Sequence, residues 1–206
     1  MGSPTRILLV RHGESEGNRD AVFTASPDVP LTARGHEQAR RTAEFLRRRY
    51  RPVRLLSSPY RRAYDTARVL SPVLGLEVEV DERFREQSFG IFAGRPYASL
   101  AEDPDFSRVP RWSWKPPGGE SLLEVRDRAG PALDELVRAA AGSEVVLVCH
   151  GGVIRALWAH VHDSWEDLPP VGNGAVVEVS HAEGRYAARV VRHEAGSELD
   201  AQVRTP

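Results

Sequence analysis

Histidine and arginine side chains follow apolar runs at three places in this chain of 206 residues. Arg11 and His12 follow the first run, Arg62 comes shortly after the second, and His150 follows the third. A neutral imidazole is a competent nucleophile toward phosphorus, and guanidinium groups bind phosphate bidentately while remaining charged. Each motif is weak alone, but together the three indicate phosphoryl transfer, with His12 as the candidate nucleophile.

The apolar runs themselves predict the strands that position these residues. Residues 7–10 are typical of a strand buried on both faces of a sheet, and residues 53–56 and 144–149 predict two further strands. The other expected elements are helices from Thr32 toward Tyr50, from near Pro59 to before Pro72, from Glu120 to Ala141 and from about Val153, and a terminal hairpin at 175–179 and 186–191 around Glu183-Gly184.

Strands that alternate with helices predict an α/β fold with a mainly parallel sheet covered on both faces. Ligands of such sheets bind beyond the carboxyl ends of the strands, so we expect the three reactive segments to share one edge. We expect a single domain over 1–206, with an irregular cap insertion at about 91–120. Trp112 and Trp114 of this cap either cover a substrate or pack the cap against the core.

Composition and charge restrict the class of function. The net charge is −1, and 41% hydrophobic with 28% charged residues is ordinary for a soluble globular protein. No global field attracts nucleic acid or an anionic membrane, and no stretch is long enough to span a bilayer. Cys149 is the only cysteine, which excludes an intrachain disulfide and favours a cytoplasmic setting. We therefore expect neither nucleic acid nor membrane as a partner.

Between about residues 5 and 160, the sequence resembles the histidine phosphatase superfamily, also called phosphoglycerate mutase-like. Its motifs have counterparts here in the expected order. They are Arg11-His12-Gly13-Glu14-Ser15 with Asn18, Asp28 to Gly35, Ser57 to Ala67, Arg85 to Gly90, and Cys149 to Arg155.

The resemblance implies a three-layer α/β/α sandwich and a phosphohistidine intermediate on His12, with Glu86 as general acid and then general base. Because arginines and histidines supply the positive charge, neither a metal nor a cofactor is expected. The other implied site residues are Arg11, Arg62 and His150 around the phosphate, with Asn18, Thr24 and the Gly151 amide as further contacts.

The resemblance also favours a phosphatase over a mutase. Mutases of the family usually carry asparagine where this chain has Gly152, and they have a longer insertion between Glu86 and His150. The expected function is metal-independent hydrolysis of a small phosphorylated metabolite, with mutase-type transfer as the alternative. Two residues depart from the family pattern: Ala25 replaces a glycine common in mutases, and Cys149 replaces a small hydroxyl residue.

Two different functions remain open for the same residues. Cys149 and Arg155 have the Cys-x5-Arg spacing of cysteine-dependent phosphatases, which use a thiolate nucleophile. That interpretation leaves His12 and Glu86 unexplained. The second possibility is a non-catalytic phosphoester-binding module, although no proposed catalytic residue is missing. His160 and His162 could suggest a metal site, but we expect them to be residues of a helix end.

Overall fold

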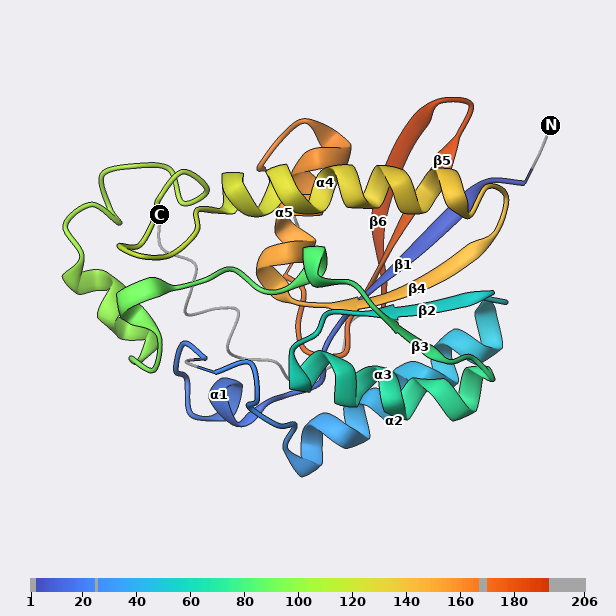
Figure 1. The fold of residues 1–206 in the computed structure, drawn as a ribbon, viewed down its shortest axis with the longest axis horizontal. Helices are drawn as coiled ribbons and strands as arrows, with labels where there is room; N and C mark the ends of the chain where they lie inside the picture. The colour runs from blue at the N-terminus through green and yellow to red at the C-terminus, as the bar shows by residue number, and fades with distance from the viewer. Residues whose placement is uncertain (1–2, 25, 167–169, 193–206) are drawn as a thin grey trace.

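The computed structural model describes residues 3–24, 26–166 and 170–192, so Ala25 lies outside the described residues. A six-stranded sheet forms the middle layer of the protein (Figure 1). Its strands are β1 (Thr5–Arg11), β2 (Arg54–Ser57), β3 (Val78–Val80), β4 (Glu144–Cys149), β5 (Val176–Ala182) and β6 (Arg185–Arg192). They lie in the order β3-β2-β4-β1-β5-β6, and the first four are parallel. The last two form an antiparallel hairpin beside β1.

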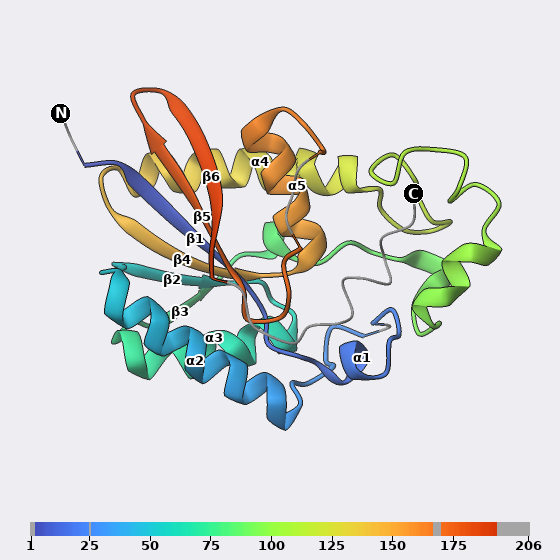
Figure 2. The same cartoon turned by 180° about the vertical axis from the view of Figure 1, so that it is seen from behind.

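Two layers of helices cover the sheet, one on each face (Figures 1 and 2). Side chains of β1 alternate between the two cores: Ile7 and Leu9 pack on one side, and Leu8 and Val10 on the other. All four are fully buried, as the continuous apolar run predicts. The predicted three-layer α/β/α sandwich is therefore confirmed. One layer consists of α2 (Ala33–Arg49) and α3 (Arg61–Leu74), and the other of α4 (Leu122–Ala139) and α5 (Gly151–His162).

The predicted end of α3 before Pro72 is wrong, because the helix continues to Leu74. Gly75 ends it instead, in the left-handed conformation with φ 70°, and its amide donates to the Ser71 carbonyl at 2.9 Å. Pro72 removes one helical hydrogen bond, but Val73 and Leu74 beyond it still pack against the core.

The remaining elements differ from expectation mainly in detail. Thr32 is the N-cap of α2, as predicted, and its hydroxyl accepts from the Gly35 amide at 3.0 Å. α5 begins at Gly151, two residues earlier than expected, since glycine is well tolerated in a first turn whose amides have no helical partner. β3 and the short helix α1 (Glu16–Arg19) were not predicted, because a three-residue strand and a single turn carry no clear periodicity.

The cap lies beyond the carboxyl ends of the parallel strands, beside the loop that carries α1 (Figures 1 and 2). It is irregular and includes the short 3-10 segment Tyr97–Glu102. Trp114 is 2% exposed and packs in a small cluster that joins Phe92 and Leu100 of the cap to Phe23 of the loop after α1. Trp112 stacks on Trp165 with 6.0 Å between ring centroids. Both tryptophans thus pack against protein.

Candidate active site

The parallel register brings the three predicted segments to one edge of the sheet. β1 pairs with β4 so that Arg11 lies opposite Cys149, and the His12 amide donates to the Cys149 carbonyl at 3.0 Å. On the other side of β4, the Ser58 amide donates to the Val148 carbonyl at 2.9 Å. His12, Ser58 and His150 therefore follow three adjacent strands, and the shared edge expected from the sequence is present.

The hydrogen bonds of His12 define which ring nitrogen is unprotonated. Nε of Arg62, which can only donate, lies 3.2 Å from His12 Nε2, so Nε2 accepts and carries the lone pair. Nδ1 lies 2.7 Å from the Gly13 carbonyl and therefore carries the proton that it donates. Burial, followed by the charges of Arg62 and Arg11, holds the pKa of His12 well below its ordinary value. His12 is thus a neutral imidazole whose Nε2 lone pair faces a guanidinium.

Arg62 lies in the first turn of α3 and is 3% exposed. Its Nη1 has no hydrogen-bond partner within the described part of the chain. Burial lowers the pKa of Arg62, while the nearby Glu86 carboxyl raises it. A buried guanidinium with an unused donor beside a helix N-terminus is suited to bind an oxyanion. Thr66 joins this helix to the nucleophile loop by accepting from the Gly13 amide at 3.1 Å.

His150 is fully buried beside His12, with 5.1 Å between the ring centroids. Its Nε2 lies 2.7 Å from Ser58 Oγ, whereas Nδ1 has no partner among the described residues. Burial is the largest cause lowering the pKa of His150, followed by the charges of Arg62, His12 and Arg11. Ser58 fixes the ring so that Nδ1 is left available for a ligand.

Arg11 and Gly151 lie against each other across the β1–β4 edge. A Cβ added to Gly151 would be 3.6 Å from the Arg11 guanidinium carbon. Nη1 of Arg11 donates to the Val171 carbonyl at 2.5 Å, which anchors the side chain. This places a guanidinium at the N-terminus of α5, where helix amides also favour an anion.

Glu86 reaches the same helix N-terminus from the loop before the cap. Its Oε1 accepts from the Gln87 amide at 2.9 Å, and its Oε2 lies 3.5 Å from the Gly152 amide. A Cβ on Gly152 would lie only 2.5 Å from Glu86 Oε1, so glycine at this position makes room for the carboxylate. The sequence did not predict this steric role of Gly152.

A half-buried ion-pair network holds the Glu86 loop and was also missed from the sequence. Arg128 of α4 donates to the Glu86 carbonyl at 3.2 Å and to both carboxylate oxygens of Glu120. Glu120 also accepts from the Ser88 amide at 3.1 Å and from Arg85 at 2.9 Å. These contacts hold the chain on both sides of Glu86, at Arg85 and at Ser88. Side-chain pairs between residues so distant in sequence produce no periodic pattern, so the sequence did not indicate them.

Of the two remaining side-chain candidates, the structure connects Asn18 to the site but not Thr24. Asn173, which was missed, donates from Nδ2 to the His12 carbonyl at 3.0 Å and to Asn18 Oδ1 at 3.1 Å. Asn18 in turn donates to the Tyr97 hydroxyl at 3.3 Å, which links the nucleophile loop to the cap. Thr24 lies against Gly17, and no hydrogen bond within the described residues joins it to His12 or Arg62. The Gly-Asn-Gly pattern before β5 was the available signal for Asn173.

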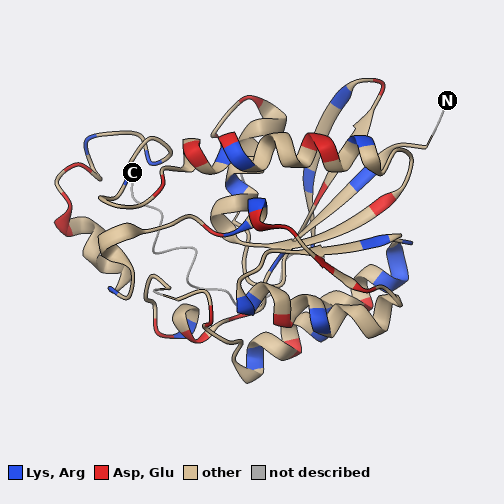
Figure 3. Ribbon diagram, in the orientation of Figure 1, with Lys and Arg blue, Asp and Glu red and all other residues tan. Residues whose placement is uncertain are grey.

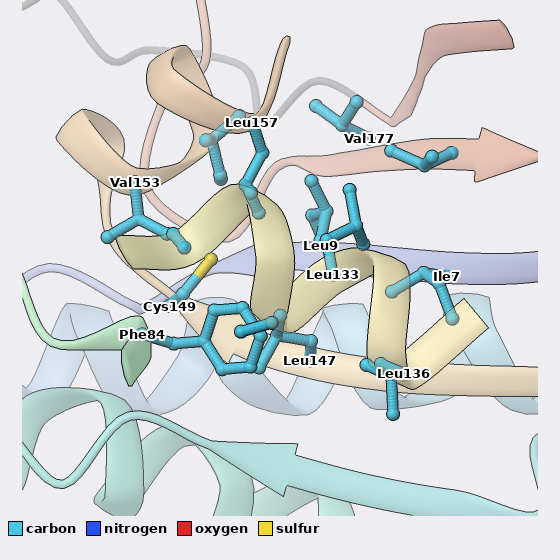
Figure 4. Close-up of a cluster of buried hydrophobic side chains, with 14 of the residues drawn as sticks. Ile7, Leu9, Phe84, Leu133, Leu136, Leu147, Cys149, Val153, Leu157 and Val177 are labelled. Atoms are coloured by element: carbon cyan, nitrogen blue, oxygen red, sulfur yellow. The ribbon is translucent and has the colours of Figure 1, made fainter. Parts of the chain in front are cut away.

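Cys149 does not meet the requirements of a thiolate nucleophile. Its side chain is fully buried among apolar groups, near Phe84 and Val153 (Figure 4). Burial is the main cause that raises the pKa of the thiol far above its ordinary value, and the Glu86 charge adds to it. A neutral, enclosed thiol is a poor nucleophile, so the cysteine-dependent interpretation loses its physical basis.

His160 and His162 each bond to a neighbouring protein group near the end of α5. His160 lies 3.0 Å from the Asp134 carboxylate, and His162 lies 3.1 Å from the Trp158 carbonyl. No group of three or more potential metal ligands occurs among the described residues. Both histidines lie in the last turn of α5, the helix end expected from the sequence.

Basic and acidic residues are interspersed along the described elements (Figure 3). None of the described helices combines the length and apolarity needed to cross a membrane.

Comparison with known families agrees with this geometry. Residues 7–194 match the model of the histidine phosphatase superfamily (branch 1). This chain belongs to that superfamily. As a histidine phosphatase it is an enzyme, a hydrolase of phosphoric monoesters.

Several relatives of this histidine phosphatase carry phosphatase names. It is 37% identical over 190 residues to glucosyl-3-phosphoglycerate phosphatase of Mycolicibacterium vanbaalenii, covering 85% of this chain and 84% of the relative. It is 37% identical over 158 residues to putative phosphoserine phosphatase 2 of Hydrogenobacter thermophilus, covering 74% and 76%. The structure of mycobacterial glucosyl-3-phosphoglycerate phosphatase with VO3 superimposes with a TM-score of 0.81 at 33% identity, covering 93% of this chain and 99% of that chain.

Proposed function

We propose that this histidine phosphatase hydrolyses a small phosphorylated, sugar-like metabolite through a phosphohistidine intermediate on His12, without a metal or other cofactor. The observation that carries the proposal is the orientation of His12, whose unprotonated Nε2 faces the buried Arg62 at 3.2 Å. A lone pair held in this way attacks phosphorus while the guanidinium holds the phosphoryl oxygens. We also propose a cytoplasmic location, since the single cysteine favours a reducing compartment.

In the first step, His12 Nε2 forms a bond to phosphorus as the ester P–O bond breaks. Protonated Glu86 gives its proton to the departing alcohol oxygen. Arg11, Arg62 and His150 Nδ1 stabilise the charge on the equatorial oxygens, because phosphoryl transfer depends mainly on positioning and electrostatics. The unused donor of Arg62 and the unused Nδ1 of His150 support these roles.

In the second step, Glu86 acts as a carboxylate and takes a proton from water. The water oxygen bonds to phosphorus, the N–P bond breaks, and inorganic phosphate leaves with His12 neutral again. Burial and the neighbouring arginines favour this neutral state, because they lower the pKa of His12. The Gly151 amide and Asn18 complete the proposed phosphate contacts, and Thr24 is the least supported member of the set.

The substrate class follows from the relatives together with the cap. The relatives carry the names glucosyl-3-phosphoglycerate phosphatase and putative phosphoserine phosphatase 2, and both names refer to small phosphorylated metabolites. The proposed ester binds between the sheet edge and the cap, so cap residues set its selectivity. We favour hydrolysis over mutase-type transfer because Gly152 leaves Glu86 at the helix N-terminus, in position to activate water.

Phosphate release from a panel of small phosphomonoesters in the presence of EDTA tests the proposal. The wild type is expected to turn over at least one sugar or glycerate ester, and His12→Ala to be inactive. His181→Ala is the matched control, since His181 pairs with Thr5 at the opposite end of β1. Isomerisation of phosphoglycerate without net phosphate release would identify a mutase, and loss of turnover with EDTA would contradict metal independence.

A further inference from the structure

A buried serine hydroxyl lies between the start of α3 and the second histidine of the site. Ser58 follows β2 directly and is fully buried. Its Oγ lies 3.3 Å from the Tyr60 amide nitrogen and 2.7 Å from Nε2 of His150. These two nitrogens are the hydrogen-bond partners of Ser58 Oγ within the part of the chain that the structure describes. The hydroxyl therefore has one backbone partner and one catalytic partner.

The two partners determine the direction of the hydrogen bond to His150. A backbone amide can only donate, so Ser58 Oγ accepts from Tyr60, and the hydroxyl proton is left for His150 Nε2. In the reverse direction, Nε2 would donate and the Ser58 proton would be buried without a described acceptor, which is unfavourable. Nε2 of His150 is thus the acceptor and carries no proton.

The charge of His150 makes this direction decisive. Burial, followed by the charges of Arg62, His12 and Arg11, lowers the pKa of His150 well below its ordinary value, so the ring is neutral. A neutral imidazole has a single N–H, and the hydrogen bond at one nitrogen decides which nitrogen carries it. Because Nε2 accepts, the proton of His150 lies on Nδ1, the buried nitrogen without a partner among the described residues.

The two histidines of the site then share a tautomer but offer different nitrogens to the substrate. The Gly13 carbonyl holds the proton of His12 on Nδ1, which leaves the Nε2 lone pair for phosphorus. Ser58 holds the proton of His150 on Nδ1 as well, but here Nδ1 is the nitrogen left for a ligand. An N–H attracts a phosphoryl oxygen, whereas a lone pair at the same place would repel it.

We propose that Ser58 is a positioning residue that fixes His150 as the Nδ1–H tautomer, so that a neutral imidazole donates a hydrogen bond to the phosphoryl group. Ser58 acts through His150 and does not contact the substrate. The inference rests on the proposed function, because the donor matters only if a phosphoryl group binds beside His12. Without the Ser58 hydroxyl, nothing donates to Nε2, and the ring can place its proton on the wrong nitrogen.

NMR of the imidazole rings tests the tautomer directly. Two-bond 1H–15N correlations, recorded with and without inorganic phosphate, identify the protonated nitrogen of His150, and the spectrum of His150→Ala assigns its signals. We expect the proton on Nδ1 in the wild type and a substantial Nε2–H population in Ser58→Ala. A wild-type His150 protonated on Nε2 or on both nitrogens, or an unchanged tautomer in Ser58→Ala, would overturn the proposal.

Kinetics show whether the tautomer matters for the reaction. Loss of one hydrogen bond to a charged group should lower kcat/KM of Ser58→Ala by about 10- to 100-fold. The fall should be similar for an alkyl phosphate and for p-nitrophenyl phosphate, because the phosphoryl oxygens are the same in both. Ser58→Thr, which retains a hydroxyl, should recover both the tautomer and the rate. A loss confined to the alkyl ester, or none at all, would contradict the assignment.

Ser71→Ala is the matched control. Ser71 donates its hydroxyl to the Leu76 carbonyl at 2.7 Å, at the far end of α3, so its removal should change kcat/KM by less than about twofold. It should leave the His150 tautomer unchanged. A fall in kcat/KM as large as that of Ser58→Ala would show that loss of any buried hydroxyl of this helix disturbs the site, and would overturn the specific role of Ser58.

A double variant separates positioning from general support of the loop. Since Ser58 acts through His150, adding Ser58→Ala to His150→Ala should lower kcat/KM by less than about threefold further. A further fall as large as the one in the wild-type background would assign Ser58 to loop structure and overturn the proposal. Failure of the proposed function is distinct, because it would show as phosphate release by His12→Ala or as none by the wild type across the panel.

Discussion

Gly152→Ala is expected to disable the proposed general acid without unfolding the protein. The new Cβ would lie 2.5 Å from Glu86 Oε1, so the carboxylate must withdraw by roughly 1 Å to reach ordinary contact. A misplacement of about 1 Å in a catalytic group can cost about 100-fold in rate, within the range of about 10² to 10⁴ for complete loss of acid catalysis. We therefore expect kcat for an alkyl phosphate to fall about 100-fold. Alanine is a better helix former than glycine, so stability should not decrease.

The assay compares an alkyl phosphate with p-nitrophenyl phosphate, whose acidic leaving group needs less protonation. Gly152→Ala should affect the alkyl ester more than the aryl ester. It should add little to Glu86→Gln, because both changes remove the same proton transfer. Gly151→Ala is the steric comparison: its Cβ meets Arg11 at an ordinary 3.6 Å and its amide is kept, so its loss should be smaller. An alkyl-ester kcat within about threefold of wild type, or multiplicative losses in the double variant, would refute the steric reasoning.

Two further predictions concern buried groups of the site. Cys149→Ala should keep turnover, because the thiol is enclosed and its pKa is raised, but it should lower the free energy of unfolding by about 1–2 kcal/mol through the cavity in the core; loss of turnover in a folded variant would return the nucleophile to the thiol. His12 and His150 have folded-state pKa values below the ordinary 6.5 of the unfolded chain, so the unfolded state binds more protons below that pH. Stability should therefore fall as the pH drops from 7 toward 5, by at most about 1.4 kcal/mol per pH unit for each histidine. Denaturant unfolding of wild type and His150→Ala at each pH measures this; an equal slope in the variant would contradict the depressed pKa.

The sequence predicts the residues proposed to bind the phosphate better than it predicts the residues that hold the Glu86 loop. Buried strands are recognisable as continuous apolar runs, and His12, Arg62 and His150 each follow one within a few residues, so local patterns place them at the same edge. Glu120 at the end of the irregular cap and Arg128 on a helix face bind groups that are distant in sequence. Only the folded chain brings them to Glu86.

Pro72 illustrates a second limit of local patterns. Proline disfavours helix, yet α3 continues past it because packing of Val73 and Leu74 and the glycine cap at Gly75 outweigh the lost hydrogen bond. At Gly152 the local pattern is also insufficient, because the sequence alone explains a glycine there only by the flexibility of its backbone. Its importance depends on the approach of the Glu86 carboxylate, which is a tertiary contact.

The most direct test of the central claim is to trap the phosphoenzyme and locate the phosphate. Enzyme mixed with labelled substrate is quenched in alkali, where phosphohistidine survives, and the modified peptide is identified by mass spectrometry. We expect phosphate on His12 in the wild type and none in His12→Ala. With p-nitrophenyl phosphate, whose acidic leaving group needs little protonation in the first step, we expect the phosphoenzyme to accumulate in Glu86→Gln, which lacks the base for the second step. Label on Cys149 or on a serine, or turnover without any label on His12, would contradict the proposed mechanism.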